Sequence, residues 1–224
     1  MLEIKNLSFS FGQKVIYDQL NMTFPISSIT GLIGKNGVGK TTLFRILTKV
    51  YRNQGGEVTL NGEAVTPNMI SFLPTDPYFY PYMEGNEYLN IVACDPSELI
   101  QSRVFASQLD LPLDDLIDNY STGMKKKIAF AAIFAQSRPI VILDEPYNGV
   151  DLESNEAIKY IIHQYAKDRV VILSSHILST ITDISDQIYH IQDAKTVSSH
   201  PKENFEAFAK AIKTQLIDKF SDSE

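Results

Sequence analysis

The stretch Gly34-Lys35-Asn36-Gly37-Val38-Gly39-Lys40-Thr41-Thr42 decides the fold, because it fits G-x-x-x-x-G-K-[ST], the phosphate-binding P-loop. Residues 29–33 before it form an apolar run typical of a short buried strand, and residues 43–47 after it carry apolar side chains at helical spacing. Glycines let the backbone curl so that its N–H groups face an anion, at a helix N-terminus that already favours negative charge. The sequence therefore predicts a strand, a phosphate-binding loop and a helix in succession.

The residues of this loop have different expected roles. The Lys40 ammonium is expected to reach the β- and γ-phosphates of a nucleotide, and the Thr41 hydroxyl to ligate Mg²⁺. The other residues expected to hold the phosphate chain are Gly34, Asn36, Gly37, Gly39 and Thr42. The alternative is an ordinary glycine-rich turn, and the flanking strand and helix argue against it.

A second signal indicates that the bound nucleotide is hydrolysed. Residues 140–143 form an apolar run typical of a central parallel strand, and Asp144 and Glu145 follow it directly. Ligands bind beyond the carboxyl ends of parallel strands, so both carboxylates are expected near the P-loop. Asp144 would hold Mg²⁺ through a water, while Glu145 is the candidate general base that orients and deprotonates the attacking water. The alternative for such an Asp-Glu pair is a turn with a helix cap.

The order of the motifs resembles that of ATP-binding cassette (ABC) transporter ATPase subunits of the exporter type, over nearly the whole chain. Residues 144–145 resemble the Walker B motif of that family, residues 145–151 its D-loop, residues 120–124 its signature sequence and residues 174–176 its switch-histidine motif. Phe11 matches the aromatic residue on which the adenine stacks. Several motifs in the correct order are far more specific than any one of them.

The resemblance also implies roles for residues outside the P-loop. His176 would donate a hydrogen bond near the γ-phosphate, whereas a lone histidine after a strand is more often structural. Ser121 and Gly123 would open a helix whose N-terminus completes the ATP pocket of a partner subunit, and the alternative is a simple N-cap serine. Asp151 in the D-loop is expected among the residues that face the nucleotide.

Three positions depart from the family pattern. Thr122 stands where the first signature glycine is usual, and Met124 stands where glutamine is usual, but neither change removes the anion site. Residues 72–76 align with the Q-loop of the family and offer Thr75 in place of the glutamine that would contact Mg²⁺ and the attacking water. Thr75 is therefore the third candidate Mg²⁺ ligand, and Asp76 could substitute for the glutamine through a water.

Length, charge and cysteine content agree with one compact nucleotide-binding unit. The chain has 224 residues and a formal net charge of −7, and this acidic balance argues against nucleic acid as a partner. Its single cysteine, Cys94, suits a reducing compartment. The sequence has neither a leader at its start nor an apolar run of about 18 to 20 residues, so a cytoplasmic location is expected. The basic run 125–127 is expected to be a solvated helix face.

The pattern along the chain predicts a single α/β nucleotide-binding domain over residues 1–224, with a P-loop NTPase core and a mostly parallel sheet. Strand alternation and turn signals in residues 1–74 favour an N-terminal antiparallel β layer. Helical patterns dominate residues 75–137, which predicts an inserted α-helical subdomain. Residues 138–200 alternate strands with helices and complete the catalytic core, and residues 201–224 are expected to form a C-terminal amphipathic helix.

Two groups of apolar side chains leave alternatives open. The first group, which follows residues 72–76, either packs in the core or forms a partner surface. Tyrosines are enriched at interfaces, and by resemblance this stretch binds the coupling helix of a membrane subunit. Its members are Tyr78, Phe79, Tyr80, Tyr82 and Tyr88. The second group, in the tail, either docks on the core of its own chain or serves a partner. Its members are Phe205, Phe208, Ile212, Leu216 and Phe220.

The sequence as a whole is identified as an ABC-family ATPase subunit that binds ATP and Mg²⁺ and powers a separate membrane-spanning subunit of an exporter. It would lie on the cytoplasmic face of the membrane. Two copies, or one copy and a related cassette, would form an ATP-dependent dimer in which Lys40 and Glu145 of one subunit face Ser121 and Gly123 of the other. The alternatives are a soluble cassette ATPase acting on ribosomes or DNA, and a non-hydrolytic nucleotide-dependent regulator.

Overall fold

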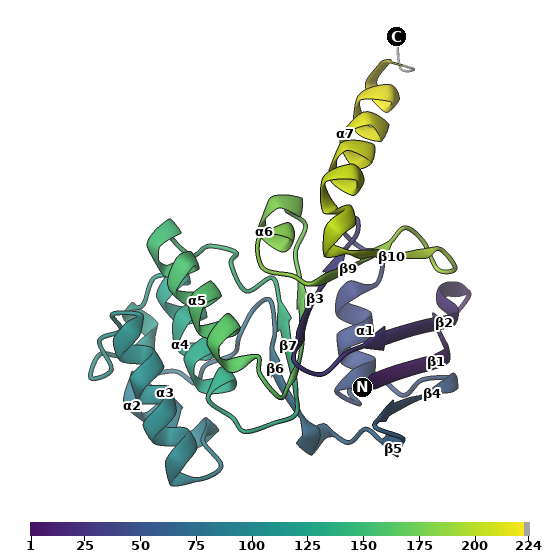
Figure 1. Cartoon of the computed structure of the whole chain (residues 1–224). Helices are drawn as coiled ribbons and strands as arrows, with labels where there is room; N and C mark the ends of the chain where they lie inside the picture. The colour runs from purple at the N-terminus through teal and green to yellow at the C-terminus, as the bar shows by residue number, and fades with distance from the viewer. Residues whose placement is uncertain (222–224) are drawn as a thin grey trace.

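The computed structural model of the protein describes the backbone of residues 1–221 and the side chains of residues 1–214. Its N-terminal layer is an antiparallel sheet with the strand order β2-β1-β4-β5 (Figure 1). These strands are β1 (Leu2–Phe11), β2 (Lys14–Phe24), β4 (Gly55–Leu60) and β5 (Glu63–Ala64). Buried and exposed side chains alternate over the last five residues of β2, from Leu20 to Phe24, as expected for a sheet that packs on one face and meets solvent on the other.

The central layer is a six-stranded sheet with the order β10-β9-β3-β8-β7-β6. Its strands are β3 (Ser28–Ile33), β6 (Ile70–Leu73), β7 (Ile140–Asp144), β8 (Val170–Ser174), β9 (Gln187–Ile191) and β10 (Val197–Pro201). All neighbouring pairs are parallel except β9 and β10. The predicted α/β class, with a mostly parallel sheet and an antiparallel N-terminal layer, is therefore confirmed. Strand β10 was not predicted from the sequence.

Helices cover both faces of the central sheet, and α1 lies between the two sheets (Figure 1). They are α1 (Lys40–Leu47), α2 (Gly85–Val92), α3 (Pro96–Gln108), α4 (Thr122–Phe134), α5 (Leu152–Tyr165), α6 (Leu178–Thr182) and α7 (Phe205–Ser221), with short 3₁₀ turns at 67–69, 117–119 and 202–204. Residues 34–39 join β3 directly to α1, as the loop pattern predicts.

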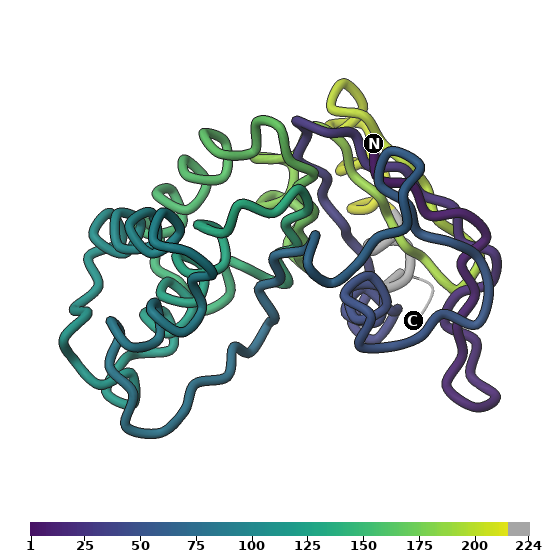
Figure 2. The backbone as a smooth tube through the Cα atoms, turned by 90° about the horizontal axis from the view of Figure 1, so that it is seen from below, coloured from purple at the N-terminus to yellow at the C-terminus, as the bar shows by residue number. Residues whose placement is uncertain are grey.

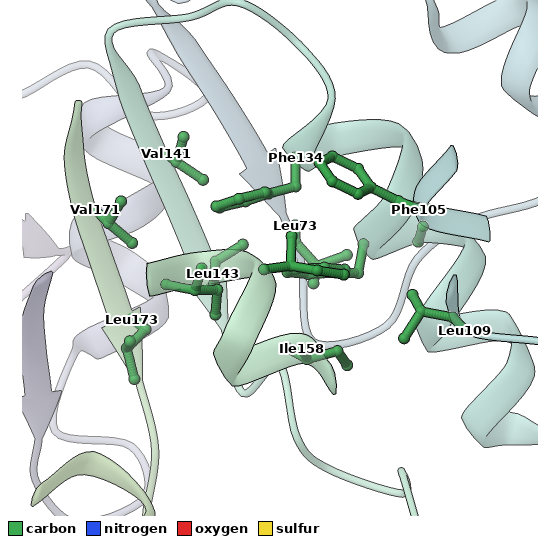
Figure 3. Packing of buried hydrophobic residues seen from close by; sticks show 14 of the residues in the cluster. Leu73, Phe105, Leu109, Phe134, Val141, Leu143, Ile158, Val171 and Leu173 are labelled. Atoms are coloured by element: carbon green, nitrogen blue, oxygen red, sulfur yellow. The ribbon is translucent and has the colours of Figure 1, made fainter. Parts of the chain in front are cut away.

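The central sheet separates two hydrophobic cores, because successive side chains of a strand point to opposite faces. On β7, Val141 and Leu143 belong to one core, while Ile140 and Ile142 belong to the other. Figure 3 shows the first core, where Val141 and Leu143 lie on the same side of β7 as Phe134 of α4. The second core joins the central sheet to α1 and to the antiparallel sheet. The carboxyl edge of β7 is thus held by packing on both sides.

Residues 75–137, all of which the structure describes, contain α2, α3 and α4 with one 3₁₀ turn, and their one β pairing is an isolated bridge between Glu84 and Leu116. In Figure 2 this segment forms a teal lobe on one side of the central strands, with the purple N-terminal strands on the other side. The division into a core of 1–74 and 138–200, a helical subdomain of 75–137 and a tail of 201–224 stays a prediction.

The aromatic run after β6 divides between core and surface. Phe79 packs against the first core and lies 4.9 Å, centroid to centroid, from Tyr88. Tyr78, Tyr80 and Tyr82 are instead 74%, 60% and 81% exposed. The core interpretation therefore holds for two of these rings, and three remain on the surface where a partner can meet them.

The tail begins by docking on its own chain. Phe205 and Phe208 at the start of α7 are buried in the first core, and Ile212 packs against it. The Phe208 ring stacks on His200 of β10 at 4.0 Å. Beyond this point α7 projects away from the rest of the chain (Figure 1). Leu216 and Phe220 lie outside the residues whose side chains are described.

Candidate active site

A pocket of about 330 Å³ opens at the carboxyl edge of β3, β7 and β8. Its lining residues are Asn36, Gly37, Gly39, Lys40, Thr41, Thr42, Thr75, Asp144, Glu145, Asn148 and His176. The P-loop follows β3, and Thr75 follows β6. Asp144 is the last residue of β7, with Glu145 directly after it, and His176 follows β8. Adjacent parallel strands therefore bring residues from four distant parts of the chain to one place.

Two glycines give the P-loop a backbone path that other residues rarely adopt. Gly37 has a φ of 77° and Gly39 a φ of 125°. A Cβ atom at Gly39 would lie 2.8 Å from the Tyr17 hydroxyl oxygen and 2.9 Å from Cγ2 of Ile16. The loop therefore passes directly over the second core, and α1 begins at the next residue, Lys40.

The Lys40 side chain turns back over the P-loop. It is only 7% exposed, and its Nζ donates a hydrogen bond of 2.6 Å to the carbonyl oxygen of Gly34. Burial lowers the pKa of Lys40, and the carboxylates of Glu145 and Asp144 act in the opposite direction. Gly34 is not part of the pocket lining but contributes through this carbonyl. The ammonium group is thus held at the pocket, beside two carboxylates.

Asp144 is almost fully buried and accepts two hydroxyl hydrogen bonds. Thr41 Oγ1 donates to one carboxylate oxygen at 2.9 Å, and Ser174 Oγ donates to the other at 2.5 Å. Ser174 Oγ also accepts a hydrogen bond of 3.1 Å from the backbone N–H of Glu145. Ser174 therefore fixes both carboxylate residues and was missed as a site residue. A hydroxyl at the buried end of a parallel strand is the signal that points to it.

Glu145 and His176 contact each other across the ends of β7 and β8. Nδ1 of His176 lies 3.0 Å from Oε2 of Glu145. Glu145 has a φ of 53°, in the left-handed region that residues with a side chain rarely occupy. Such a conformation costs about 1 to 3 kcal/mol and persists only where its surroundings enforce it. The strained backbone here presents the Glu145 carboxylate to the pocket that Lys40 enters.

Phe11 lies outside the pocket lining, at the end of β1. Its ring is 47% exposed and packs edge-on against Phe9 at 4.9 Å and Tyr51 at 5.4 Å. An aromatic ring that is held by two neighbouring rings and is half exposed is suited to stack on a planar base. The structure therefore provides an aromatic surface separate from the groups that would hold phosphates.

The start of α4 lies against the D-loop, and Ser121, Gly123 and Asp151 are also outside the pocket lining. Ser121 accepts a hydrogen bond of 3.2 Å from the backbone N–H of Met124 and is therefore the N-cap of α4, while its expected role in the ATP pocket of a partner subunit stays a prediction. Asp151 likewise caps α5 by accepting from the Ser154 N–H at 2.9 Å. A Cβ atom at Gly123 would lie 2.8 Å from the carbonyl oxygen of Gly149.

The basic run 125–127 is not a solvated face, so that prediction is wrong. Lys126 and Lys127 are 3% and 9% exposed, while Lys125 is half-buried. Lys127 Nζ donates to Ser154 Oγ at 3.1 Å, on α5. Nearly every residue of α4 after its first turn is buried, so lysines at these positions turn inward with the apolar residues that follow them.

Thr75 and Asp76 face different spaces. Thr75 lines the pocket of Lys40 and also a neighbouring pocket of about 190 Å³, whereas Asp76 lines only the neighbouring one. Of the two candidates for the missing glutamine, Thr75 is therefore the one placed beside Asp144. Asn148 lines both pockets and was not predicted as a site residue. Its position three residues after Glu145, in the same loop, is the feature that points to it.

The residues present fit a nucleoside triphosphate with a divalent cation. The positive φ angles of Gly37 and Gly39 curl the loop at the N-terminus of α1, where backbone N–H groups favour an anion, and Lys40 supplies a cation. Mg²⁺ takes few protein ligands and binds through one or two side chains plus phosphate oxygens, and Thr41 and Asp144 offer oxygen atoms in contact with each other. Fold and site together define a P-loop nucleotide-binding domain of the kind that hydrolyses its nucleotide.

Comparison with known families makes this class more specific. Residues 17–148, more than half of the chain, match the sequence model of the family described as ABC transporter. The chain belongs to this family. It is accordingly an ATP-binding subunit with ATPase chemistry, and the earlier resemblance is confirmed.

Relatives and solved structures agree with the family. The lantibiotic transport ATP-binding protein SrtF of Streptococcus pyogenes is 26% identical over 97% of this chain and 98% of its own length. The bacitracin transport ATP-binding protein BcrA of Bacillus licheniformis is 28% identical over 90% of this chain and 70% of its own. The structure of an ATP-binding subunit of an ABC transporter has a TM-score of 0.84 at 21% identity and covers 91% of both chains. A bacterial Atm1-family ABC exporter with ATP bound has a TM-score of 0.85 at 20% identity, covering 96% of this chain and 41% of its own.

Phe11→Ala tests the aromatic surface. Losing one stacked base contact weakens binding by roughly 1 kcal/mol, so the dissociation constant for ATP should rise about fivefold. Binding of tripolyphosphate, which has no base, should stay unchanged and serves as the control. Titration calorimetry with both ligands measures this, and an unchanged ATP affinity would show that the adenine stacks elsewhere.

Proposed function

We propose that the chain hydrolyses ATP in the pocket of Lys40 and Glu145 and thereby powers export through a separate membrane-spanning subunit. The observation that carries this proposal is the contact of Glu145 with His176 at 3.0 Å, beside Lys40 and Asp144 in one pocket. Positioning and charge neutralisation dominate phosphoryl transfer, and these side chains supply both. The family and the ATP-binding relatives support the same reaction.

Each side chain has a definite task in this proposal. Lys40 neutralises the β- and γ-phosphates, and Glu145 orients and deprotonates the attacking water. His176, already in contact with Glu145, holds that carboxylate and donates toward the γ-phosphate. Thr41 and Asp144, with Thr75 beside them, are the residues that would hold Mg²⁺. When bound, Mg²⁺ would neutralise part of the negative charge on the phosphate oxygens.

A dimer would complete the site. Ser121 and Gly123 lie at the N-terminus of α4, where backbone N–H groups favour an anion, but they are not part of the pocket lining of their own chain. Leu152 beside the D-loop is 78% exposed. We propose that a second copy, or a related cassette, places its α4 N-terminus over the ATP bound at Lys40, head to tail.

The membrane partner would meet the exposed tyrosines. No helix in the described part of the chain is long and apolar enough to cross a bilayer. Tyr78, Tyr80 and Tyr82 offer large amphipathic rings on one loop of the helical segment, a composition typical of interfaces. We propose that this loop holds a short helix of a membrane-spanning chain, which places the ATPase on the cytoplasmic face. The transport names of the relatives and the exporter structure support this assignment.

The double substitution Tyr80→Ser and Tyr82→Ser tests the partner surface. Truncating interface aromatics at a hot spot often costs more than about 2 kcal/mol, so retention of a co-expressed membrane subunit should fall more than about thirtyfold. Melting temperature and basal ATPase activity should stay unchanged, because both rings are exposed.

Tyr160→Ser is the matched control for this experiment, since Tyr160 on α5 is 60% exposed, like Tyr80. It should release no partner. A double variant that melts early, or that keeps its membrane subunit, would contradict the proposed surface.

A further inference from the structure

Lys126 is buried but has no part in the proposed steps of ATP hydrolysis. Its side chain leaves α4 and reaches the loop that follows β6, where Nζ donates to the carbonyl oxygens of Pro74, at 3.3 Å, and Thr75. The residue is only 3% exposed. An ammonium group is costly to bury unless it is hydrogen-bonded, so the buried position of Lys126 depends on its bonds to these two carbonyl oxygens.

Burial of Lys126 is offset only in part by the carboxylates around it. Burial lowers its pKa, and the carboxylates of Asp76, Asp144 and Glu145 act in the opposite direction. Two of these carboxylates belong to the pocket where ATP is proposed to bind. Lys126 therefore lies close to the carboxylates of the active site without lining the pocket itself.

Lys126 lines a pocket that lies next to the active site. A pocket of about 190 Å³ lies between the β6 loop, the start of α4 and the D-loop, with Thr75, Thr122, Lys126 and Gly149 among its lining residues. Lys126 is thus the link from α4 to the backbone of Thr75, the residue that reaches into the neighbouring pocket of Lys40.

The side chain at position 75 is short, so its position depends on the backbone that carries it. Thr75 lacks the long amide side chain of glutamine, and its place in the pocket is therefore set by where its backbone is held. Lys126 bonds to the carbonyl of Thr75 itself and to that of the preceding residue. Bonds to backbone carbonyls fix the path of the loop whatever side chains it carries.

We propose that Lys126 is a positioning residue for ATP hydrolysis. It binds the loop of Pro74 and Thr75 to helix α4 and so holds Thr75 at a fixed position relative to Asp144 and Glu145. This inference rests on the proposed active site. A displacement of about 1 Å near reacting groups can slow a reaction about a hundredfold, so loss of the tie acts on turnover. Nucleotide binding depends on Lys40 and the P-loop, which the tie does not touch.

The test compares Lys126→Met with Lys125→Met in the full chain. Methionine keeps most of the stem and removes the charge and donors, and the half-buried Lys125 undergoes the same charge change one position earlier on α4. For Lys126→Met the kcat for ATP should fall at least about tenfold, with KM within about threefold of the unchanged chain. Lys125→Met should keep its kcat. Lys126→Arg, which retains charge and donors, should recover at least about a third of the lost rate.

A fluorescence reporter separates positioning from simple destabilisation. The chain contains no tryptophan, so Tyr78→Trp places a single indole on the loop. Addition of ATP should change its emission, and Lys126→Met should abolish that change while ATP still binds. If Lys126→Met does not fold, Lys126→Gln is compared with Lys125→Gln under the same criteria.

Several outcomes would overturn the proposal. They are an unchanged kcat in the folded Lys126 variant, equal losses in Lys126→Met and Lys126→Arg, and a rise in KM that accounts for the whole effect. Glu145→Gln, measured alongside, distinguishes this failure from failure of the proposed site. If Glu145→Gln also keeps full activity, the pocket itself is wrongly assigned, whereas an inactive Glu145→Gln beside an active Lys126→Met rejects Lys126 alone.

Discussion

Glu145→Gln should bind ATP as tightly as the unchanged chain and hydrolyse it at least about a hundredfold more slowly, the scale expected for losing a positioned general base. The amide keeps the size of the side chain and its place beside His176, but it cannot accept a proton from water. The phosphate contacts of Lys40 and the P-loop are left in place, so affinity should not change. Turnover by phosphate release and affinity by calorimetry measure the two effects separately.

The slow variant also gives access to the dimer. Because ATP would no longer be consumed, size-exclusion chromatography should show a dimer of Glu145→Gln that depends on added ATP. Glu57→Gln, at an exposed position of β4, is the matched control and should behave like the unchanged chain. Full turnover in Glu145→Gln would remove this carboxylate from the chemistry.

Lys40→Ala should have the second largest effect, on binding rather than on the chemical step alone. A hydrogen bond to a charged group contributes about 1.5 to 3 kcal/mol, so affinity for ATP and for GTP should both fall about 10- to 150-fold. AMP has no β- or γ-phosphate and should bind as before, which makes it the internal control. Equal weakening for AMP would indicate a collapsed loop instead of a lost phosphate contact.

The parts of the site that the sequence predicts best are those with fixed local spacing. The P-loop from Gly34 to Thr42, and the carboxylates Asp144 and Glu145 after an apolar run, depend on neighbours a few residues away. Their positions at strand ends follow from the pattern itself, because parallel strands end at one edge. The strand order of the central sheet depends on pairing between distant segments, which no local pattern specifies.

The parts that sequence reasoning missed depend on tertiary packing. Consecutive lysines in a helix normally indicate solvent exposure, but α4 is enclosed on nearly every side, so Lys126 and Lys127 turn inward. Ser174 has a role only because β8 lies beside β7, which places its hydroxyl between Asp144 and the Glu145 N–H. Tyr78 and Phe79 are adjacent and of similar character, yet only the fold decides which of them is covered.

The left-handed backbone at Glu145 has a consequence for how this protein responds to engineering. Its φ of 53° is a conformation that asparagine or glycine adopts with less strain than glutamate. A search for heat-resistant variants scored by melting temperature alone would therefore favour those residues at this position. The selected variants would melt at higher temperature but would lack the carboxylate that faces the pocket. A screen for thermal resistance should therefore hold this position constant or score catalytic turnover together with melting.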